Sequence, residues 1–147
     1  MEKLSDELIA RLVSSALAAR GKAYAPYSRF AVGAAVLAAS GEIYCGANVE
    51  NASYPAGICA ERNAIFHAVA TGERRLSAIA LCGGKEGADL GSCFPCGICR
   101  QVMREFCDPE QFLVIVATSP TDWTIHTLAR LLPDSFGPES LGESVVL

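Results

Sequence analysis

Three cysteines in two short segments constrain the fold of this chain most strongly, because they can bind one metal only if both segments meet. The segments are Cys59-Ala60-Glu61 and Pro95-Cys96-Gly97-Ile98-Cys99. Three thiolates can hold Zn²⁺ and leave one coordination position open, as in catalytic zinc sites. We therefore predict one zinc ion per chain, bound by Cys59, Cys96 and Cys99. Glu61 is predicted to lie beside the metal as a proton carrier and not as a ligand.

Both cysteine segments are expected at the beginnings of helices, where thiolates are favoured. If Pro95 occupies the first turn of a helix, Cys96 and Cys99 lie three residues apart on one face of it. Cys59 would begin a second helix. The free N–H groups and the dipole at each helix beginning stabilise negative sulfur. Three thiolates also give the zinc site a net negative charge, which the adjacent Arg62 is expected to offset in part.

Two other interpretations of the cysteines stay open at this point. A single Cys-x-x-Cys pair can be a redox pair, and a structural zinc site would need a fourth Cys or His ligand. Cys93 is the candidate for a fourth ligand, but it precedes the proline and is expected in a loop. Neither His67 nor His126 is expected to be a ligand; both are predicted to be packing or surface residues. The other three cysteines lie in apolar stretches and are predicted to be buried: Cys45, Cys82 and Cys107.

Length, composition and charge narrow the class of protein. The chain has 147 residues, 51% of them hydrophobic, which suits one domain spanning residues 1–147. No apolar run approaches the roughly 20 residues of a membrane-spanning helix, so no membrane association is predicted. The charged N-terminal segment does not resemble a secretory signal, and seven cysteines without a signal favour a cytoplasmic location. The net charge of −4 favours a small-molecule substrate over a nucleic acid.

Hydrophobic patterning predicts alternating helices and strands. Helices are expected over residues 6–21, 59–71, 95–107 and 127–132. Strands are expected over residues 30–39, 42–49, 76–82 and 112–117, with a short strand or turn around Trp123. The first two strands form a hairpin through Ser40-Gly41, and residues 83–94 are expected to be loop. This alternation predicts an α/β fold, a three-layer α/β/α sandwich around a mixed sheet.

Five segments follow one another in a distinctive order: Pro26–Ala35, Gly46–Pro55, Cys59–Arg62, Pro95–Gln101 and Leu131–Pro138. Together they resemble the cytidine deaminase family along nearly the whole chain. The first segment, for example, is similar to that family's P-Y-S-x-F-x-V-G-A signature. The resemblance is to the short branch of the family, which has three cysteine ligands, a five-stranded mixed sheet and a homotetrameric assembly.

The resemblance implies a reaction and assigns roles to matching positions. The reaction is the hydrolytic removal of the 4-amino group of cytidine and deoxycytidine, which belongs to pyrimidine salvage and releases ammonia. Cys59, Cys96 and Cys99 would hold zinc, Glu61 would carry protons, and Arg62 would lie beside the ligands. The nucleoside would contact Phe30 and the Ala60 backbone with its base, Asn48 and Glu50 with its ribose, and Tyr54 and Phe136 at a subunit boundary. Phe136 would reach into a neighbouring subunit's site.

The sequence departs from the family pattern at a few positions. Phe94 stands before the Pro-Cys pair, where the family usually has a small hydroxyl residue, so either the pocket wall or the surroundings of the metal ligands are expected to differ there. Ala31 and Ser53 also replace commoner residues, with no consequence that follows from their chemistry. None of these changes removes a predicted ligand or the proton carrier.

Three rival functions remain in view. A deaminase of a modified cytosine nucleoside, such as blasticidin S, is disfavoured because Asn48 and Glu50 suit ribose hydroxyls. A polynucleotide deaminase is disfavoured by the acidic charge and by a site shared between subunits. A non-catalytic zinc module would have no use for Glu61 beside the metal.

Overall fold

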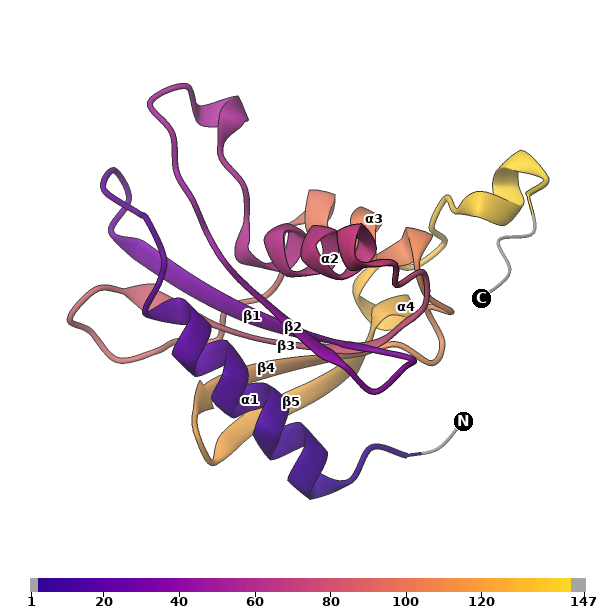
Figure 1. Cartoon of the computed structure of the whole chain (residues 1–147), viewed down its shortest axis with the longest axis horizontal. Helices are drawn as coiled ribbons and strands as arrows, with labels where there is room; N and C mark the ends of the chain where they lie inside the picture. Colours follow the sequence, from indigo (N-terminus) through magenta and orange to yellow (C-terminus); the bar gives the residue numbers. More distant parts are fainter. Residues whose placement is uncertain (1–2, 144–147) are drawn as a thin grey trace.

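A five-stranded sheet forms the middle layer of the molecule (Figure 1). The computed structural model describes residues 3–143. Its strands are β1 (Phe30–Ala38), β2 (Ile43–Ala47), β3 (Leu76–Lys85), β4 (Leu113–Ser119) and β5 (Asp122–Thr127). Their order across the sheet is β2-β1-β3-β4-β5. Only the β3–β4 pair is parallel among the described strands, so the sheet is mixed, as predicted.

Helices cover both faces of this sheet. The helix α1 (Asp6–Arg20) packs on one face, and α2 (Ala60–Thr71) and α3 (Gly97–Glu105) lie on the other (Figure 1). The shorter elements are α4 (Leu128–Leu131) and two 3₁₀ turns, η1 (Tyr54–Ala56) and η2 (Pro138–Leu141). The predicted three-layer α/β/α sandwich is confirmed. Within residues 3–143, no helix has the length and apolar character that a membrane crossing requires.

The central strands are buried on both faces, which explains their continuous apolar runs. In β3, Ile79 and Leu81 belong to the core beneath α2 and α3, whereas Ala78 and Ala80 belong to the core beneath α1. Small residues let the helices lie close to the strands. A Cβ added at Gly46 of β2 would lie 2.4 Å from the backbone nitrogen of Ala64 in α2. This close contact fixes the position of α2, which carries part of the candidate site.

The ends of the first two helices follow the sequence signals. Ser5 caps α1, because its Oγ accepts a hydrogen bond from the Leu8 N–H at 3.1 Å. Gly72 ends α2 with a φ of 116°, a left-handed conformation that glycine adopts without strain. Both predictions of helix ends are therefore confirmed.

Three local predictions are wrong. The third strand continues to Lys85, because Gly83 and Gly84 pair with β1 instead of forming a loop. The helix α3 begins at Gly97 with Cys96 as its N-cap, so Pro95 lies outside the first turn. Cys45 is exposed because β2 is an edge strand of the sheet. The two other cysteines of that group, Cys82 and Cys107, are buried as predicted.

Candidate metal centre

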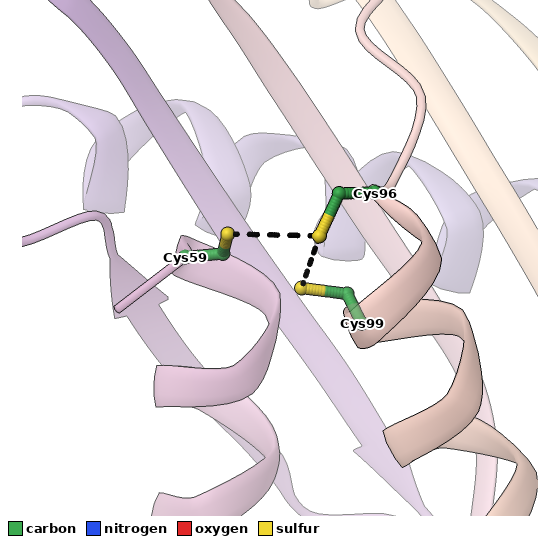
Figure 2. A group of neighbouring side chains, drawn as sticks. All are labelled: Cys59, Cys96 and Cys99. Carbon is green, nitrogen blue, oxygen red and sulfur yellow. Dashed lines mark hydrogen bonds between the residues drawn. The ribbon is translucent and has the colours of Figure 1, made fainter. Parts of the chain in front are cut away.

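The three predicted cysteine ligands lie together between the beginnings of α2 and α3 (Figure 2). Their Sγ atoms all fall within 4.8 Å of one another. Cys96 Sγ is 3.9 Å from Cys59 Sγ and 3.5 Å from Cys99 Sγ. Sulfur ligands of a tetrahedral zinc ion, with Zn–S distances of about 2.3 Å, lie roughly 3.8 Å apart. The donor set therefore fits one zinc ion per chain, and within residues 3–143 the metal-binding group contains no fourth protein ligand.

Helix capping explains how the backbone brings these sulfurs together. Cys59 and Cys96 are the N-caps of α2 and α3, both with extended backbone, and neither side chain makes a capping hydrogen bond. Their sulfurs are thus free to face the third one, which Cys99 supplies from the first turn of α3. Cys99 is fully buried, Cys59 is half-buried and Cys96 is exposed. The cluster is consequently open on one side.

The electrostatics of the cluster favour a thiolate at Cys59. Hydrogen bonds from Cys99 and Arg62 lower the pKa of the Cys59 thiol to about 5, against burial, which acts to raise it. Arg62 Nη2 donates to Cys59 Sγ at 3.5 Å. The hydrogen bond to Cys59, together with burial, holds the pKa of Cys99 above its ordinary value. Arg62 thus places a positive charge against the negative sulfurs, as the sequence led us to expect.

Glu61 lies next to the cluster without joining it. It occupies the first turn of α2 and is only 4% exposed. Burial raises the pKa of its carboxyl group above the ordinary value. Among the described residues, the metal-binding group contains the three cysteines and not this carboxylate. A buried carboxyl group with a raised pKa is a candidate for a proton carrier in a reaction.

A cavity of about 570 Å³ opens beside the cluster, a volume suited to a small ligand. Glu61, Cys59 and Cys96 line one part of it. Five of the six predicted substrate-binding residues also line it: Phe30, Asn48, Glu50, Tyr54 and Ala60. Phe136 does not. It lies on the tail between α4 and η2, with 58% of its surface exposed.

Hydrogen bonds to the backbone hold Asn48 in the cavity. Its Oδ1 accepts from the Val32 N–H at 2.8 Å, and its Nδ2 donates to the Phe30 carbonyl oxygen at 2.8 Å. Both partners belong to β1, so the side chain of Asn48 is anchored to the sheet. Its orientation is therefore set before any ligand binds.

Glu50 is held by the turn that precedes β1. Its Oε1 accepts from the backbone N–H groups of Tyr27 and Ser28 at 2.9 and 3.1 Å. The Ser28 hydroxyl donates to Oε2. These hydrogen bonds hold the pKa of Glu50 below its ordinary value, and the bond from the Ser28 side chain has the largest effect. Glu50 consequently presents an ionised carboxylate to the cavity.

Ser28 and Arg100 also support the site, although their roles were not predicted. Ser28 lies inside the Pro26–Ala35 segment, but its bond to Glu50 spans 22 positions of the chain. Arg100 follows Cys99 directly and donates to the carbonyl oxygens of Pro95 and Leu131, both at 2.7 Å. The position of Ser28 and Arg100 inside the two motifs was the only signal available. Cys93 lines the cavity outside the sulfur cluster, and burial raises the pKa of its thiol to about 11.

The sequence and the fold of this chain are both similar to those of known cytidine deaminases. A sequence model of the cytidine and deoxycytidylate deaminase zinc-binding region matches residues 6–115. The chain is 43% identical over 133 residues to a cytidine deaminase of Sporosarcina psychrophila, covering 90% of this chain and 94% of that protein. The crystal structure of cytidine deaminase from Burkholderia pseudomallei has a TM-score of 0.78 and 43% identity, over 90% of this chain and 100% of that one. The crystal structure of cytidine deaminase from Mycobacterium tuberculosis matches with a TM-score of 0.73 and 40% identity, and the match covers 91% of this chain and 99% of that one.

Proposed function

The chain belongs to the cytidine and deoxycytidylate deaminase family, and we propose that it hydrolyses the 4-amino group of cytidine and deoxycytidine, giving uridine or deoxyuridine and ammonia. One observation carries the proposal. A cluster of three sulfurs, two of which line the cavity, lies beside a buried carboxyl group that lines the same cavity, and this cavity has the volume of a small-ligand site. The cavity therefore combines a metal position, a proton carrier and room for a nucleoside.

The roles near the metal follow from this geometry. Cys59, Cys96 and Cys99 would hold one zinc ion, and Arg62 would offset their charge through its contact with Cys59. When bound, zinc would lower the pKa of a water molecule towards about 7, which would make that water a nucleophile at neutral pH. Three features keep the sulfurs in place: the burial of Cys99, the close packing of Gly46 against α2, and the hydrogen bond from Arg100 to the Pro95 carbonyl oxygen.

Glu61 would move the protons of the reaction. Its carboxylate accepts a proton from water and delivers it to N3 of the pyrimidine, which makes C4 more electrophilic. The hydroxide left from that water would add to C4. The same carboxylate would then take the proton of the new C4 hydroxyl group and transfer it to the amine, which leaves as ammonia when its bond to C4 breaks. Burial raises the pKa of this carboxyl group, which favours its holding a proton between the two transfers. A structural zinc module would gain nothing from burying this carboxyl group.

The remaining lining residues would bind the nucleoside. Glu50 is an ionised acceptor, and Asn48 Oδ1 retains a lone pair after its bond to Val32, so both can accept ribose hydroxyl protons. Phe30 would pack against the base, and the Ala60 backbone would contact the edge of the base. This pairing of polar groups favours an ordinary ribose over the altered sugar of a modified cytosine nucleoside.

Assembly and location complete the proposal. Tyr54 and Phe136 are 76% and 58% exposed, as expected for aromatic residues that meet a neighbouring subunit in a homotetramer. Phe136 would complete a neighbour's site. We further propose that residues 1–147 act as one domain, in the cytoplasm, on nucleosides of pyrimidine salvage and not on nucleic acid.

Substitution of Glu61 tests the proposed function. Purified protein should carry about one zinc per chain and convert cytidine to uridine. The conversion is measured by the change in absorbance and by the release of ammonia. Glu61→Gln should retain the zinc, by elemental analysis, and lose activity by about 10²–10⁴-fold or more, because one group serves several proton transfers. Glu110→Gln, on a surface loop between α3 and β4, is the matched control and should leave activity unchanged. Retention of more than about a tenth of the wild-type rate by Glu61→Gln would show that the mechanism is wrong.

A further inference from the structure

Phe94 is the lining residue that the family pattern does not explain. Its side chain is 41% exposed and lines the cavity, together with Cys96 two positions further along the chain. Because Cys96 contributes one of the three clustered sulfurs, Phe94 borders the end of the cavity where the chemistry takes place. A bulky aromatic ring therefore occupies the surroundings of the reacting carbon.

The backbone next to Phe94 is held in place. Pro95 restricts the chain through its fixed φ, and its carbonyl oxygen accepts a hydrogen bond from Arg100 Nε at 2.7 Å. Arg100 is itself anchored by donating to the Leu131 carbonyl oxygen at 2.7 Å. The segment that enters α3 thus has little freedom to move Phe94 away from the cavity.

The ring of Phe94 is supported as well. His126 of β5 packs against it edge to face, with ring centroids 5.1 Å apart and an interplanar angle of 61°. Thr124 Oγ1 and His126 Nε2 lie 3.0 Å apart and form a hydrogen bond, which fixes the imidazole. Phe94 is consequently braced through its backbone by α3 and through its ring by β5.

The proposed reaction orients a pyrimidine relative to this ring. The ring neighbours of the reacting carbon C4 are N3 and C5. The three sulfurs lie between the beginnings of α2 and α3 (Figure 2). Glu61 belongs to the first turn of α2, whereas Phe94 lies two positions before Cys96, the N-cap of α3, and both residues line the cavity. If N3 is directed to Glu61 on the α2 side, the C5 edge on the other side of C4 is directed towards the segment that contains Phe94.

We propose that Phe94, positioned by His126, makes the enzyme select cytosine nucleosides without a substituent at C5. The inference rests on the proposed function. A methyl group at C5 would compete for space with a ring that is supported on two sides. One methyl or methylene group in an apolar pocket changes kcat/KM by about 10–200-fold. Phe94 is therefore a specificity-determining residue and His126 is a positioning residue.

The test compares cytidine with 5-methylcytidine. The wild type should have a kcat/KM for cytidine at least about 10-fold above that for 5-methylcytidine, and Phe94→Ser should reduce this ratio by about 10-fold or more. Phe94→Leu, which keeps an apolar side chain, should give an intermediate ratio if Phe94→Ser folds poorly. Phe66→Ser is the matched control, because Phe66 is an exposed phenylalanine of α2 that does not line the cavity. It should leave the ratio unchanged.

The positioning role of His126 is tested by the ratio of the two kcat/KM values, which a general loss of stability would not change. His126→Ala should change the ratio in the same direction as Phe94→Ser, and His126→Phe, which keeps an aromatic contact, should restore it. Titration calorimetry with uridine and 5-methyluridine should show the same change in relative affinity without turnover. If cytidine is deaminated and neither ratio changes in the Phe94 variants, the selectivity inference alone is wrong. If the wild type neither converts cytidine nor binds uridine, the proposed function fails and the inference fails with it.

Discussion

Gly46→Ala should disturb the metal centre from a distance, because it moves the helix that carries it. The added Cβ would lie 2.4 Å from the Ala64 nitrogen and 2.7 Å from the Ala60 carbonyl oxygen, whereas ordinary contacts begin at 3.4 Å. Both contact atoms are backbone, so α2 must shift by about 1 Å relative to β2. Overpacking of this kind costs about 1–3 kcal/mol of folding free energy, or roughly 2–12 °C in Tm for a chain of this size.

The same shift moves Cys59 and Glu61, which begin α2. A displacement of about 1 Å can reduce catalysis by about 10²-fold. We therefore expect Gly46→Ala to lower kcat/KM for cytidine by about that factor, and to lose zinc to a competing chelator at lower chelator concentration than the wild type. Both are measured on folded protein, well below the Tm of the variant.

Gly33→Ala is the matched control. Its Cβ would lie 2.0 Å from the Ala16 carbonyl oxygen and therefore displaces α1, which carries none of the proposed site residues. This variant should lose stability, by the same packing argument, and keep a much larger share of its zinc affinity and activity. If Gly46→Ala and Gly33→Ala lost zinc affinity and activity equally at comparable loss of stability, the proposed coupling of α2 to the site would be refuted.

Three further predictions follow from single contacts. The pKa of Glu50 is lowered in the folded state, so its hydrogen bonds stabilise the protein at pH values above the ordinary carboxyl pKa of about 4.3. This stabilisation is lost as the pH falls through the lowered pKa. The difference in Tm between the wild type and Glu50→Gln should therefore shrink on acidification. Cys93→Ser should retain about one zinc per chain by elemental analysis, and loss of the metal would show that Cys93 is a fourth ligand. Gly137→Ala would place a Cβ 2.4 Å from the guanidinium carbon of buried Arg104, so the tail after α4 should become more sensitive to limited proteolysis, and unchanged sensitivity would contradict this packing.

Local signals predicted much of the fold because they act over a few residues. A cap such as Ser5 and a stop such as Gly72 depend only on neighbouring backbone groups. The extension of β3 through Gly83 and Gly84 depends instead on pairing with β1, about 50 positions earlier in the chain. Glycines in isolation favour a loop, and only the partner strand makes them part of the sheet. The exposure of Cys45 likewise follows from the edge position of β2, which an apolar run of sequence does not reveal.

In the candidate site, too, some residues could be predicted from local sequence, whereas others depend on contacts with distant parts of the chain. Spacing within two short segments was enough to predict the sulfur cluster, because each segment begins a helix. The supporting contacts join residues far apart in the chain, as with Ser28 and Glu50 or Arg100 and Leu131, which are 22 and 31 positions apart. A motif can include such residues, but it does not say which partner each one holds.

The side chain of Asn48 shows why fold and function constrain the same position. Its amide donates to the Phe30 carbonyl oxygen and accepts from the Val32 N–H, so one side chain satisfies a donor and an acceptor of β1. An aspartate of the same shape would place a carboxylate oxygen 2.8 Å from the Phe30 carbonyl, where two acceptors repel each other. A leucine would leave both backbone groups without this partner, at a cost of about 1–3 kcal/mol for a buried group such as the Val32 N–H. The amide alone completes the strand and still keeps a lone pair on Oδ1, so under the proposed function the sheet itself would prepare the sugar-binding side of the cavity.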